Sequence, residues 1–397
     1  MWEKRYENQK LWILLYIIFG LLAAVSLIQG CSNAIAVSQD FQWDAAKALT
    51  LRINPYIESM TPTGILDQYH WEDYYLQMEA NQFPSLLMLL FPYTLLAPLT
   101  ARYVWLASNL VFTVLMIVLL RKTFLATLDR RLWILLILFM ISGTPYRNQL
   151  GVGQHTIFSF LFFLAAVYFS RRGEESGKAG YTVGTILCLA VSYFKYTLTV
   201  PLALYFVYKR KWKELILSVL IHVGLTILAA LWLHTGVLDL IIQPLQVSSA
   251  LAAEGGIDFG ALLQGSPLAF VLAGIVMVFL FIMMLKMPQG VDAGVISMLV
   301  LWSLIVTYHR TYDFFVLVVV AAFFYETGLD IRQSLKNGIL CYYFILMVLV
   351  NYVLRIFSEA LPVLICFGTL YYIFTIWVTY INITTCRVHP EQMTDKQ

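Results

Sequence analysis

The sequence predicts an all-α, polytopic integral membrane protein of about twelve transmembrane helices. Hydrophobic residues make up 60% of the 397 residues and charged residues only 12%, whereas a soluble globular chain carries roughly 25% charged residues. Continuous apolar runs such as 11–30 and 215–233 approach the ~20 residues that a helix needs to cross a bilayer. Because these runs are continuous and not alternating, they favour helices over a transmembrane β-barrel.

Short polar segments divide the chain into twelve expected spans. In chain order they are 11–30, 103–120, 132–147, 156–170, 181–194, 196–208, 214–234, 266–285, 293–308, 313–325, 338–353 and 361–381. The run from Phe83 to Pro98 is also apolar, but three prolines interrupt it, so we expect an interfacial or re-entrant helix there. Because the spans on either side of Lys195 are short, we expect a kink or shallow turn at that residue.

The distribution of basic residues predicts the orientation. With both termini placed in the cytoplasm, 19 of the 26 Lys and Arg lie on the inner side, as the positive-inside rule prefers. Counting 83–98 as a full span would invert everything after it. The sequence therefore predicts a multi-pass protein of the cell or plasma membrane whose larger loops face outward. The seven basic residues left outside are Lys47, Arg52, Arg102, Arg147, Lys195, Arg310 and Arg355.

A single transmembrane domain over 1–397 is expected, with two larger outer segments. Segment 32–102 should contain short interfacial helices and gathers acidic residues, which suggests a catalytic loop. Its acids are Asp40, Asp44, Glu58, Asp67, Glu72, Asp73 and Glu79. Segment 235–265 is rich in glycine, which favours either a mobile loop that closes over a substrate or an ordinary flexible connector.

No cofactor is indicated. Three of the five cysteines lie in expected spans, and the five show no paired spacing, so neither a disulfide framework nor a zinc site is expected. The acidic loop could bind a divalent metal, but no metal is required. The sequence contains no dinucleotide-binding or P-loop pattern, and no nucleic-acid partner is expected.

Asp40 is the candidate general base. It follows the first span by about ten residues and stands next to aromatic residues, where a carboxylate can have a raised pKa. Asp44, one helical turn further on, competes for the role, and either residue could instead cap a helix or be a solvated charge. Tyr56 belongs to a group of loop aromatics that could stack on sugar rings or form an interfacial belt.

A second polar cluster is expected where the ninth and tenth spans meet. His309, Arg310 and Asp313 lie at the membrane edge, where charged groups are costly and usually functional. Arg310 could bind a phosphate through its planar fork, or form a structural salt bridge with Asp313. His309 and Asp313, four residues apart, could share one helix face. Arg147, His155 and Lys195 also face outward in this topology, where basic groups either bind a lipid phosphate or snorkel.

Several short motifs resemble a known family. Asp40 followed by Asn54-Pro55-Tyr56 resembles the aspartate and NPY signature of membrane glycosyltransferases of the GT-C fold. The closer similarity is to glycosyltransferase family 87, the polyprenyl-phosphate-mannose-dependent mannosyltransferases. Further matching segments are Phe83-Pro84, Leu95 to Pro98, Trp105 to Asn109, Gly153-Gln154, Lys195, and His309 with Tyr312-Asp313. The resemblance covers about residues 10–330, with departures at Arg52 and Ser85.

The resemblance implies an inverting transfer of a hexose, with mannose expected, on the extracytoplasmic face. Asp40 would be the catalytic base, and Arg310, Lys195 or Arg147 would stabilise the departing phosphate. The implied partners are a polyprenyl-phosphate-linked sugar donor, a glycan or glycolipid acceptor and membrane lipids. The residues expected to bind substrate are Asp44, Tyr56, Arg147, His155, Lys195, His309, Arg310 and Asp313.

Two other functions remain open at this point. An O-antigen-type polymerase or ligase would place catalytic bases in a large late outer loop, but segment 235–265 contains no Lys or Arg. A lipid-linked glycan transporter or flippase should place charges in the middle of its spans, whereas here the polar groups collect at the outer ends.

Overall fold

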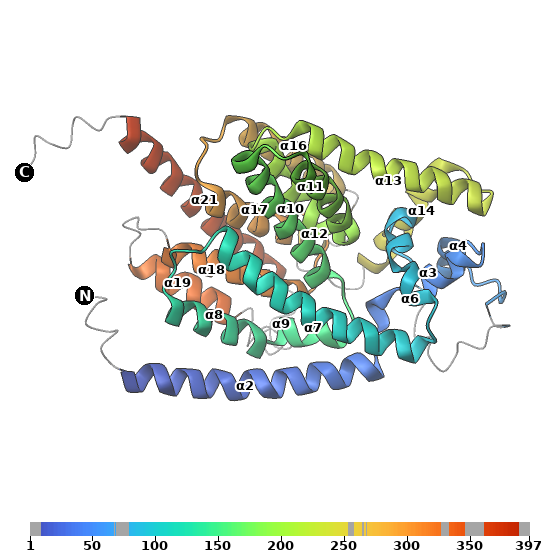
Figure 1. The fold of residues 1–397 in the computed structure, drawn as a ribbon, viewed down its shortest axis with the longest axis horizontal. Coiled ribbons are helices and arrows are strands. Elements are labelled where there is room, and N and C mark those ends of the chain that lie inside the picture. Colours follow the sequence, from blue (N-terminus) through green and yellow to red (C-terminus); the bar gives the residue numbers. More distant parts are fainter. Residues whose placement is uncertain are drawn as a thin grey trace, which may run out of the picture.

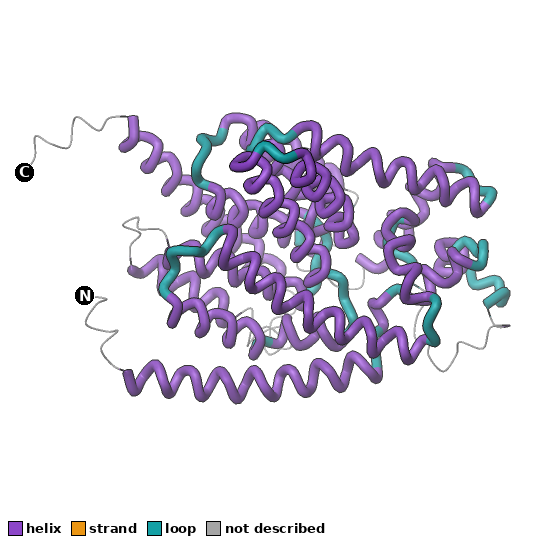
Figure 2. Tube along the Cα trace, in the orientation of Figure 1, coloured by secondary structure: helices purple, strands orange, loops and turns teal. Residues whose placement is uncertain are grey.

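The structure, a computed structural model, describes residues 9–66, 68, 79–252, 258–263, 266, 268–326, 333–345 and 361–388. Every regular element in these ranges is a helix (Figure 2), which confirms the all-helical prediction. Residues 346–353 of the expected span 338–353 lie outside the described ranges, as do 67, 69–78, 253–257 and 264–265 of the two outer segments.

Five helical stretches in the described ranges are long and apolar enough to cross a membrane. They are α2 (Gln9–Ala36), α7 (Pro98–Thr123), the stretch Ala179–Tyr208, α13 (Trp212–Leu233) and α16 (Leu268–Lys286). The bent pair α9 (Thr144–Gly151) and α10 (Thr156–Ser176), which turns by 103°, would make a sixth. The structure therefore supports an integral membrane protein but does not confirm twelve spans.

The difference from the expected count arises because several inner helices are short. α8 (Arg130–Ser142), α11 (Ala179–Ser192), α12 (Tyr196–Tyr208) and α17 (Asp292–Val306) contain 13 to 15 residues each. At ~1.5 Å per residue they measure roughly 20–23 Å, less than the ~30 Å hydrocarbon core. The length of an apolar run in the sequence does not show where a buried helix ends, because a helix can stop at a polar site before it crosses the hydrocarbon core.

The stretch Ala179–Tyr208 turns back on itself. The 3₁₀ turn η4 (Tyr193–Lys195) separates α11 from α12, and Lys211 Nζ beyond α12 lies 3.1 Å from Glu174 Oε1 in α10. Since α11 starts directly after α10, both ends of the stretch lie close together. The stretch is therefore two short helices that reverse direction at η4, where the sequence predicted a kink or shallow turn at Lys195.

The first outer segment forms short helices at one end of the molecule, with α14 (Val237–Ala252) beside them (Figure 1). These are η1 (Gln39–Phe41), α3 (Trp43–Thr50) and α4 (Pro55–Met60). Asn54 caps α4, because its side chain accepts from two backbone N–H groups, and Pro55 stands at the start of the helix. The Asn54 amide also donates to Gln243 of α14 (3.0 Å).

The apolar run from Phe83 to Pro98 is broken at its prolines. It contains α5 (Pro84–Leu87), η3 (Met88–Leu90) and α6 (Phe91–Thr94), and Pro98 begins α7. Proline is favoured in the first turn of a helix, where no intrahelical N–H bond is lost. The structure thus has short helical pieces where the sequence predicted an interfacial or re-entrant element.

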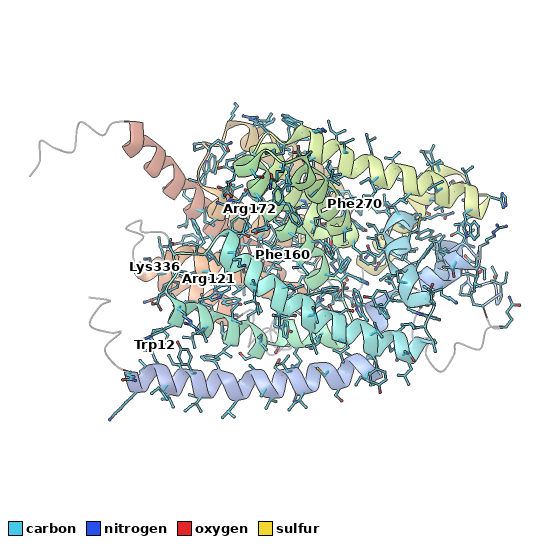
Figure 3. All side chains as sticks on the ribbon, viewed as in Figure 1. Trp12, Arg121, Phe160, Arg172, Phe270 and Lys336 are labelled. Carbon is cyan, nitrogen blue, oxygen red and sulfur yellow. The ribbon has the colours of Figure 1, made fainter. Side chains whose placement is uncertain are left out.

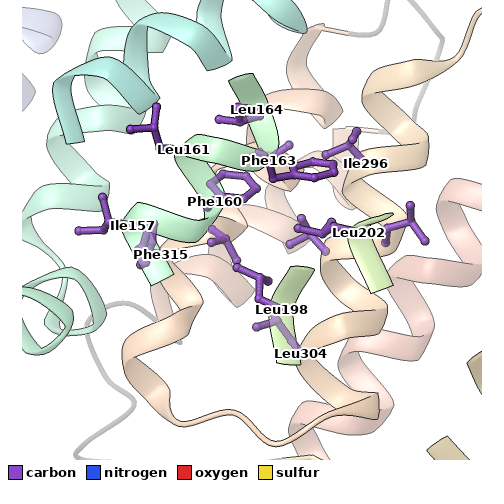
Figure 4. Packing of buried hydrophobic residues seen from close by; sticks show 14 of the residues in the cluster. Ile157, Phe160, Leu161, Phe163, Leu164, Leu198, Leu202, Ile296, Leu304 and Phe315 are labelled. Atoms are coloured by element: carbon purple, nitrogen blue, oxygen red, sulfur yellow. The ribbon is translucent and has the colours of Figure 1, made fainter. Parts of the chain in front are cut away.

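A packed core lies beneath the polar turns described below. Phe160 of α10, Leu198 of α12, Leu304 of α17 and Phe315 of η5 (Thr311–Leu317) are buried within it, and Figure 4 shows these side chains interlocking. α18 (Val318–Glu326), α19 (Gln333–Phe344) and α21 (Leu361–Val388) follow. This core is shared by α10, α12, α17 and η5. It therefore fixes the positions of the polar residues at the ends of these helices relative to one another.

Two of the basic side chains expected on the cytoplasmic side lie away from the first outer segment. Arg121 and Lys336 are toward the end of the molecule where α2 begins, marked by Trp12 (Figure 3), whereas α3, α4 and α6 lie at the other end (Figure 1). This separation agrees with the expected charge asymmetry, and the side of the membrane remains a prediction.

Candidate functional site

Four polar turns converge at the end of the core. They are η1, the break between α9 and α10, η4, and the segment leading into η5. The last three of these turns, together with α14, line a cavity of about 330 Å³. Its polar lining includes Gln154, Lys195, Asp258, Tyr308 and Tyr312.

Asp40 is held by the break between α9 and α10. Its backbone N–H donates to Val152 O (2.9 Å), and its Oδ2 accepts from Gln154 Nε2 (3.1 Å). The flanking residues Ser38 and Gln42 both adopt left-handed backbone conformations, so η1 is a tight turn that leaves one acidic side chain directed at this break.

The environment of Asp40 shifts the pKa of its carboxyl group upward, so the protonated form persists to higher pH than usual. Burial raises the pKa of Asp40, while the charges of Lys195 and Arg310 and the hydrogen bond from Gln154 oppose this rise. A carboxylate with a raised pKa binds a proton more strongly when it is ionised.

A buried ion pair stands on the opposite wall. Lys195 Nζ lies 3.6 Å from Asp313 Oδ2, and His309 Nδ1 is 2.7 Å from the same oxygen. The Thr156 hydroxyl donates to the other Asp313 oxygen. His309 and Asp313 are fully buried behind the cavity, whereas Lys195 lines it. Asp313 thus orients the Lys195 ammonium toward the cavity.

Arg310 has a different partner from the one considered in the sequence. Its Nε donates to the Tyr308 hydroxyl (2.5 Å), while Asp313 pairs with Lys195 and His309. Tyr312 accepts from Gln154 Nε2 (2.8 Å), and the Lys195 ammonium lies 5.3 Å from the centre of its ring. Tyr312 therefore stands between Lys195 and Gln154, while Tyr308 holds Arg310.

Asp258 ties the second outer segment to the site. Its Oδ1 caps α15 (Phe259–Leu262), and its Oδ2 accepts from the His309 backbone N–H (3.2 Å). Burial raises the pKa of Asp258, against these hydrogen bonds. This part of the segment is anchored; whether the segment closes over a substrate stays a prediction.

An apolar groove adjoins the cavity. It has a volume of about 470 Å³ and is lined by α12, α13 and neighbouring elements, including Val200, Ala203 and Val223. Tyr196 lines both the groove and the cavity, and its hydroxyl is 3.1 Å from Ser248 Oγ of α14. The groove and the cavity therefore meet at one tyrosine.

Four expected site residues lie outside this cluster or behind it. Asp44 accepts from the Ala45 N–H at the start of α3, and burial raises its pKa to about 6. Arg147 donates to Gln29 of α2 (2.9 Å). Tyr56 is buried and donates to Gln82 O (2.7 Å), while His155 contacts Phe41 O (3.1 Å). The last two support the walls.

Sequence reasoning assigned no role to Gln154, Asp258, Tyr308, Tyr312 or Tyr196. The Gly153-Gln154 pair and the neighbours of His309 were visible as motifs. However, no sequence spacing distinguishes a glutamine or tyrosine in a functional site from one elsewhere in the chain. Among the residues the structure describes, no group of three or more His, Cys, Asp or Glu side chains is arranged to hold a metal ion.

Fold and site together define a helical membrane protein in which an ammonium lines a cavity beside an apolar groove, and a carboxylate is hydrogen-bonded to the cavity residue Gln154. The model of glycosyltransferase family 87 matches residues 84–325, more than half of the chain. The chain belongs to glycosyltransferase family 87, and it is accordingly a membrane glycosyltransferase. No curated protein and no solved structure matches the chain.

Proposed function

We propose that this enzyme transfers a hexose, with mannose expected, from a polyprenyl-phosphate donor to a glycan or glycolipid acceptor with inversion at the anomeric carbon. The reaction would take place on the extracytoplasmic face. The observation that carries this proposal is the meeting of a polar cavity and an apolar groove at Tyr196. A lipid-phosphate sugar has the same two parts, a polar head and a hydrocarbon chain.

The groove supports a lipid-linked donor. Residues such as Val200, Ala203 and Val223 offer hydrocarbon contacts, and the transfer of apolar surface onto them stabilises a bound isoprenoid by roughly 25 cal/mol per Å² where water is displaced. With the chain in the groove, the phosphate and sugar would reach the cavity past Tyr196. A nucleotide-sugar donor would leave the groove without an occupant.

Asp40 is proposed to act as the general base. It would take the proton from an acceptor hydroxyl as that oxygen attacks the anomeric carbon, while the bond from that carbon to the phosphate oxygen breaks on the opposite face. One glycosidic bond forms, one sugar–phosphate bond breaks, and the proton on Asp40 later passes to solvent. Polyprenyl phosphate is the second product.

Lys195 is the best-placed cation for the departing phosphate. Its ammonium lines the cavity and is held from behind by Asp313, so it needs little reorganisation as charge develops on the phosphate. Arg310, beside Tyr308, would contribute a second positive charge. Both cations also act on Asp40, which would keep the base ionised until the phosphate binds.

The test uses the purified full-length protein in detergent micelles. The probe is a radiolabelled polyprenyl-phosphate mannose, with octyl α-mannoside as acceptor, and we expect labelled disaccharide and free polyprenyl phosphate. GDP-mannose in place of the lipid donor should give no product. Transfer from GDP-mannose, or binding of the lipid donor without turnover in the presence of acceptor, would overturn the proposal.

A tryptophan placed in the groove tests the lipid site separately. Val200→Trp should raise KM for the lipid donor at least several-fold, because the added ring fills space that the chain would occupy. Leu187→Trp, on an exposed face of α11, is the matched control and should leave KM unchanged. Equal KM values for the two variants would place the lipid chain elsewhere.

A further inference from the structure

Gln154 lies between the two walls of the site and touches both. We propose that it is a positioning residue for Asp40: its amide fixes the direction of the Asp40 carboxylate and stabilises the ionised form that accepts the acceptor's proton. The inference deepens the proposed function and rests on it. It is carried by the hydrogen bonds of one side chain and by the rigidity of its backbone.

The orientation of the Gln154 amide is determined by its three partners. Its Oε1 accepts from the His155 backbone N–H (2.9 Å), while its Nε2 donates to Asp40 Oδ2 (3.1 Å) and to the Tyr312 hydroxyl (2.8 Å). An amide rotated by half a turn would set Oε1 against a carboxylate oxygen and Nε2 against an N–H donor. Both amide hydrogens are thus committed to the site.

The backbone at Gln154 is equally constrained. Its N–H donates to Gln149 O (3.1 Å), and its carbonyl accepts from Gln149 Nε2 (2.6 Å). The preceding Gly153 has φ +72°, and a Cβ there would lie 3.1 Å from Ser38 Oγ, so this tight approach to η1 requires glycine. Trp105 Nε1 donates to Gly153 O (2.8 Å). The amide is therefore delivered to Asp40 from a rigid turn.

Three other charged groups act on Asp40 independently of its hydrogen bond with Gln154. They are Lys195 from η4, Arg310 from the segment before η5, and Asp313 from η5. A neutral substitution at Gln154 leaves all three in place. Its effect on the ionisation of Asp40 therefore reports the amide bond and not the surrounding charges.

The experiment compares the pH dependence of kcat/KM for mannose transfer from polyprenyl-phosphate mannose to octyl α-mannoside. Gln154→Leu should move the acid limb to higher pH by about one unit, because a hydrogen bond to a charged group is lost. Gln154→Glu should move it further, since a second carboxylate disfavours ionisation of Asp40. In both variants the rate should recover partly at high pH.

Gln149→Leu is the matched control. Gln149 is a buried glutamine of the same turn that bonds the backbone of Gln154, so its loss should lower the rate at every pH without moving the limb. If Gln154→Leu behaves in the same way, Gln154 has only a structural role and the proposal is overturned.

A second variant keeps the test decisive if Gln154→Leu does not fold. Tyr312→Phe removes one acceptor of the same amide and should move the acid limb upward by less than Gln154→Leu; an unmoved limb would overturn the proposal. The variant Asp40→Asn distinguishes failure of the proposed function from failure of the proposed role of Gln154. If that variant remains active, Asp40 is not the base, whatever Gln154 does.

Discussion

The buried pair of Lys195 and Asp313 allows a quantitative prediction. Asp313→Asn removes the charge of a side chain that is fully buried, while the Lys195 side chain is only 8% exposed. A buried charge left without its partner costs about 3–5 kcal/mol. Arg310 is itself a cation and bonds the neutral Tyr308 hydroxyl, so it cannot replace the lost negative charge. We therefore expect Asp313→Asn to lower the free energy of unfolding by about 3–5 kcal/mol.

The reciprocal change should cost less. Lys195→Met removes the ammonium but leaves Asp313 with His309 at 2.7 Å and with the Thr156 hydroxyl, so we expect a loss of about 1–2 kcal/mol. In the double variant neither residue leaves a buried charge without its partner. Its loss should be smaller than the sum of the two single losses by more than ~1 kcal/mol.

The free energy of unfolding is measured by titrating mixed micelles with SDS, and mannose transfer is measured on the same samples. Asp292→Asn is the matched control, because Asp292 lies away from the cavity and its cationic partners Lys209 (3.5 Å) and Arg171 (3.9 Å) keep side-chain exposures of 14% and 38%, so neither becomes a fully buried unpaired charge. It should cost less stability and leave transfer intact. Additive single losses, or equal losses for Asp313→Asn and Asp292→Asn, would refute the reasoning.

Three further predictions concern the base and the topology. Asp40→Asn should lower kcat by ~10²–10⁴ with donor affinity retained, whereas Asp44→Asn should stay active; the reverse result would move the base to Asp44. Because burial raises the pKa of Asp40 and only its ionised form accepts a proton, the wild-type rate should fall as pH decreases through that raised pKa. A rate that is constant down to pH ~4 would contradict this. In sealed cells, an impermeant thiol reagent should label Ser59→Cys but not Lys336→Cys, and the opposite pattern would invert the orientation.

Much of the fold follows from local properties of the chain. Apolar composition predicts helices in a membrane, and Pro84, Pro92 and Pro98 correctly mark where the run after the first outer segment breaks. The turn at Lys195 was also visible, because two apolar runs too short to be ordinary spans met at a charged residue. These features depend only on residues that are adjacent along the chain, so they can be read from the sequence.

The number of membrane crossings could not be read in the same way. The expected span 132–147 is divided between α8 and α9, and α9 forms with α10, which contains the expected span 156–170, a pair bent by 103°. Whether an apolar run crosses, bends or ends early depends on what it packs against. Here the inner helices end at a polar cavity, and that cavity exists only because distant segments meet.

For the candidate site, the sequence alone pointed to the acid in the first outer segment and to the polar cluster at His309 as predictions, and its motifs pointed to the family that the family model then showed. Only the tertiary structure decided the partners: Asp313 with Lys195 and not Arg310, Gln154 with Asp40, and Arg147 with α2. Residue type limits which chemistry a side chain can perform. Hydrogen bonds act over about 3 Å, so which groups act together depends on contacts between residues more than a hundred positions apart in the chain.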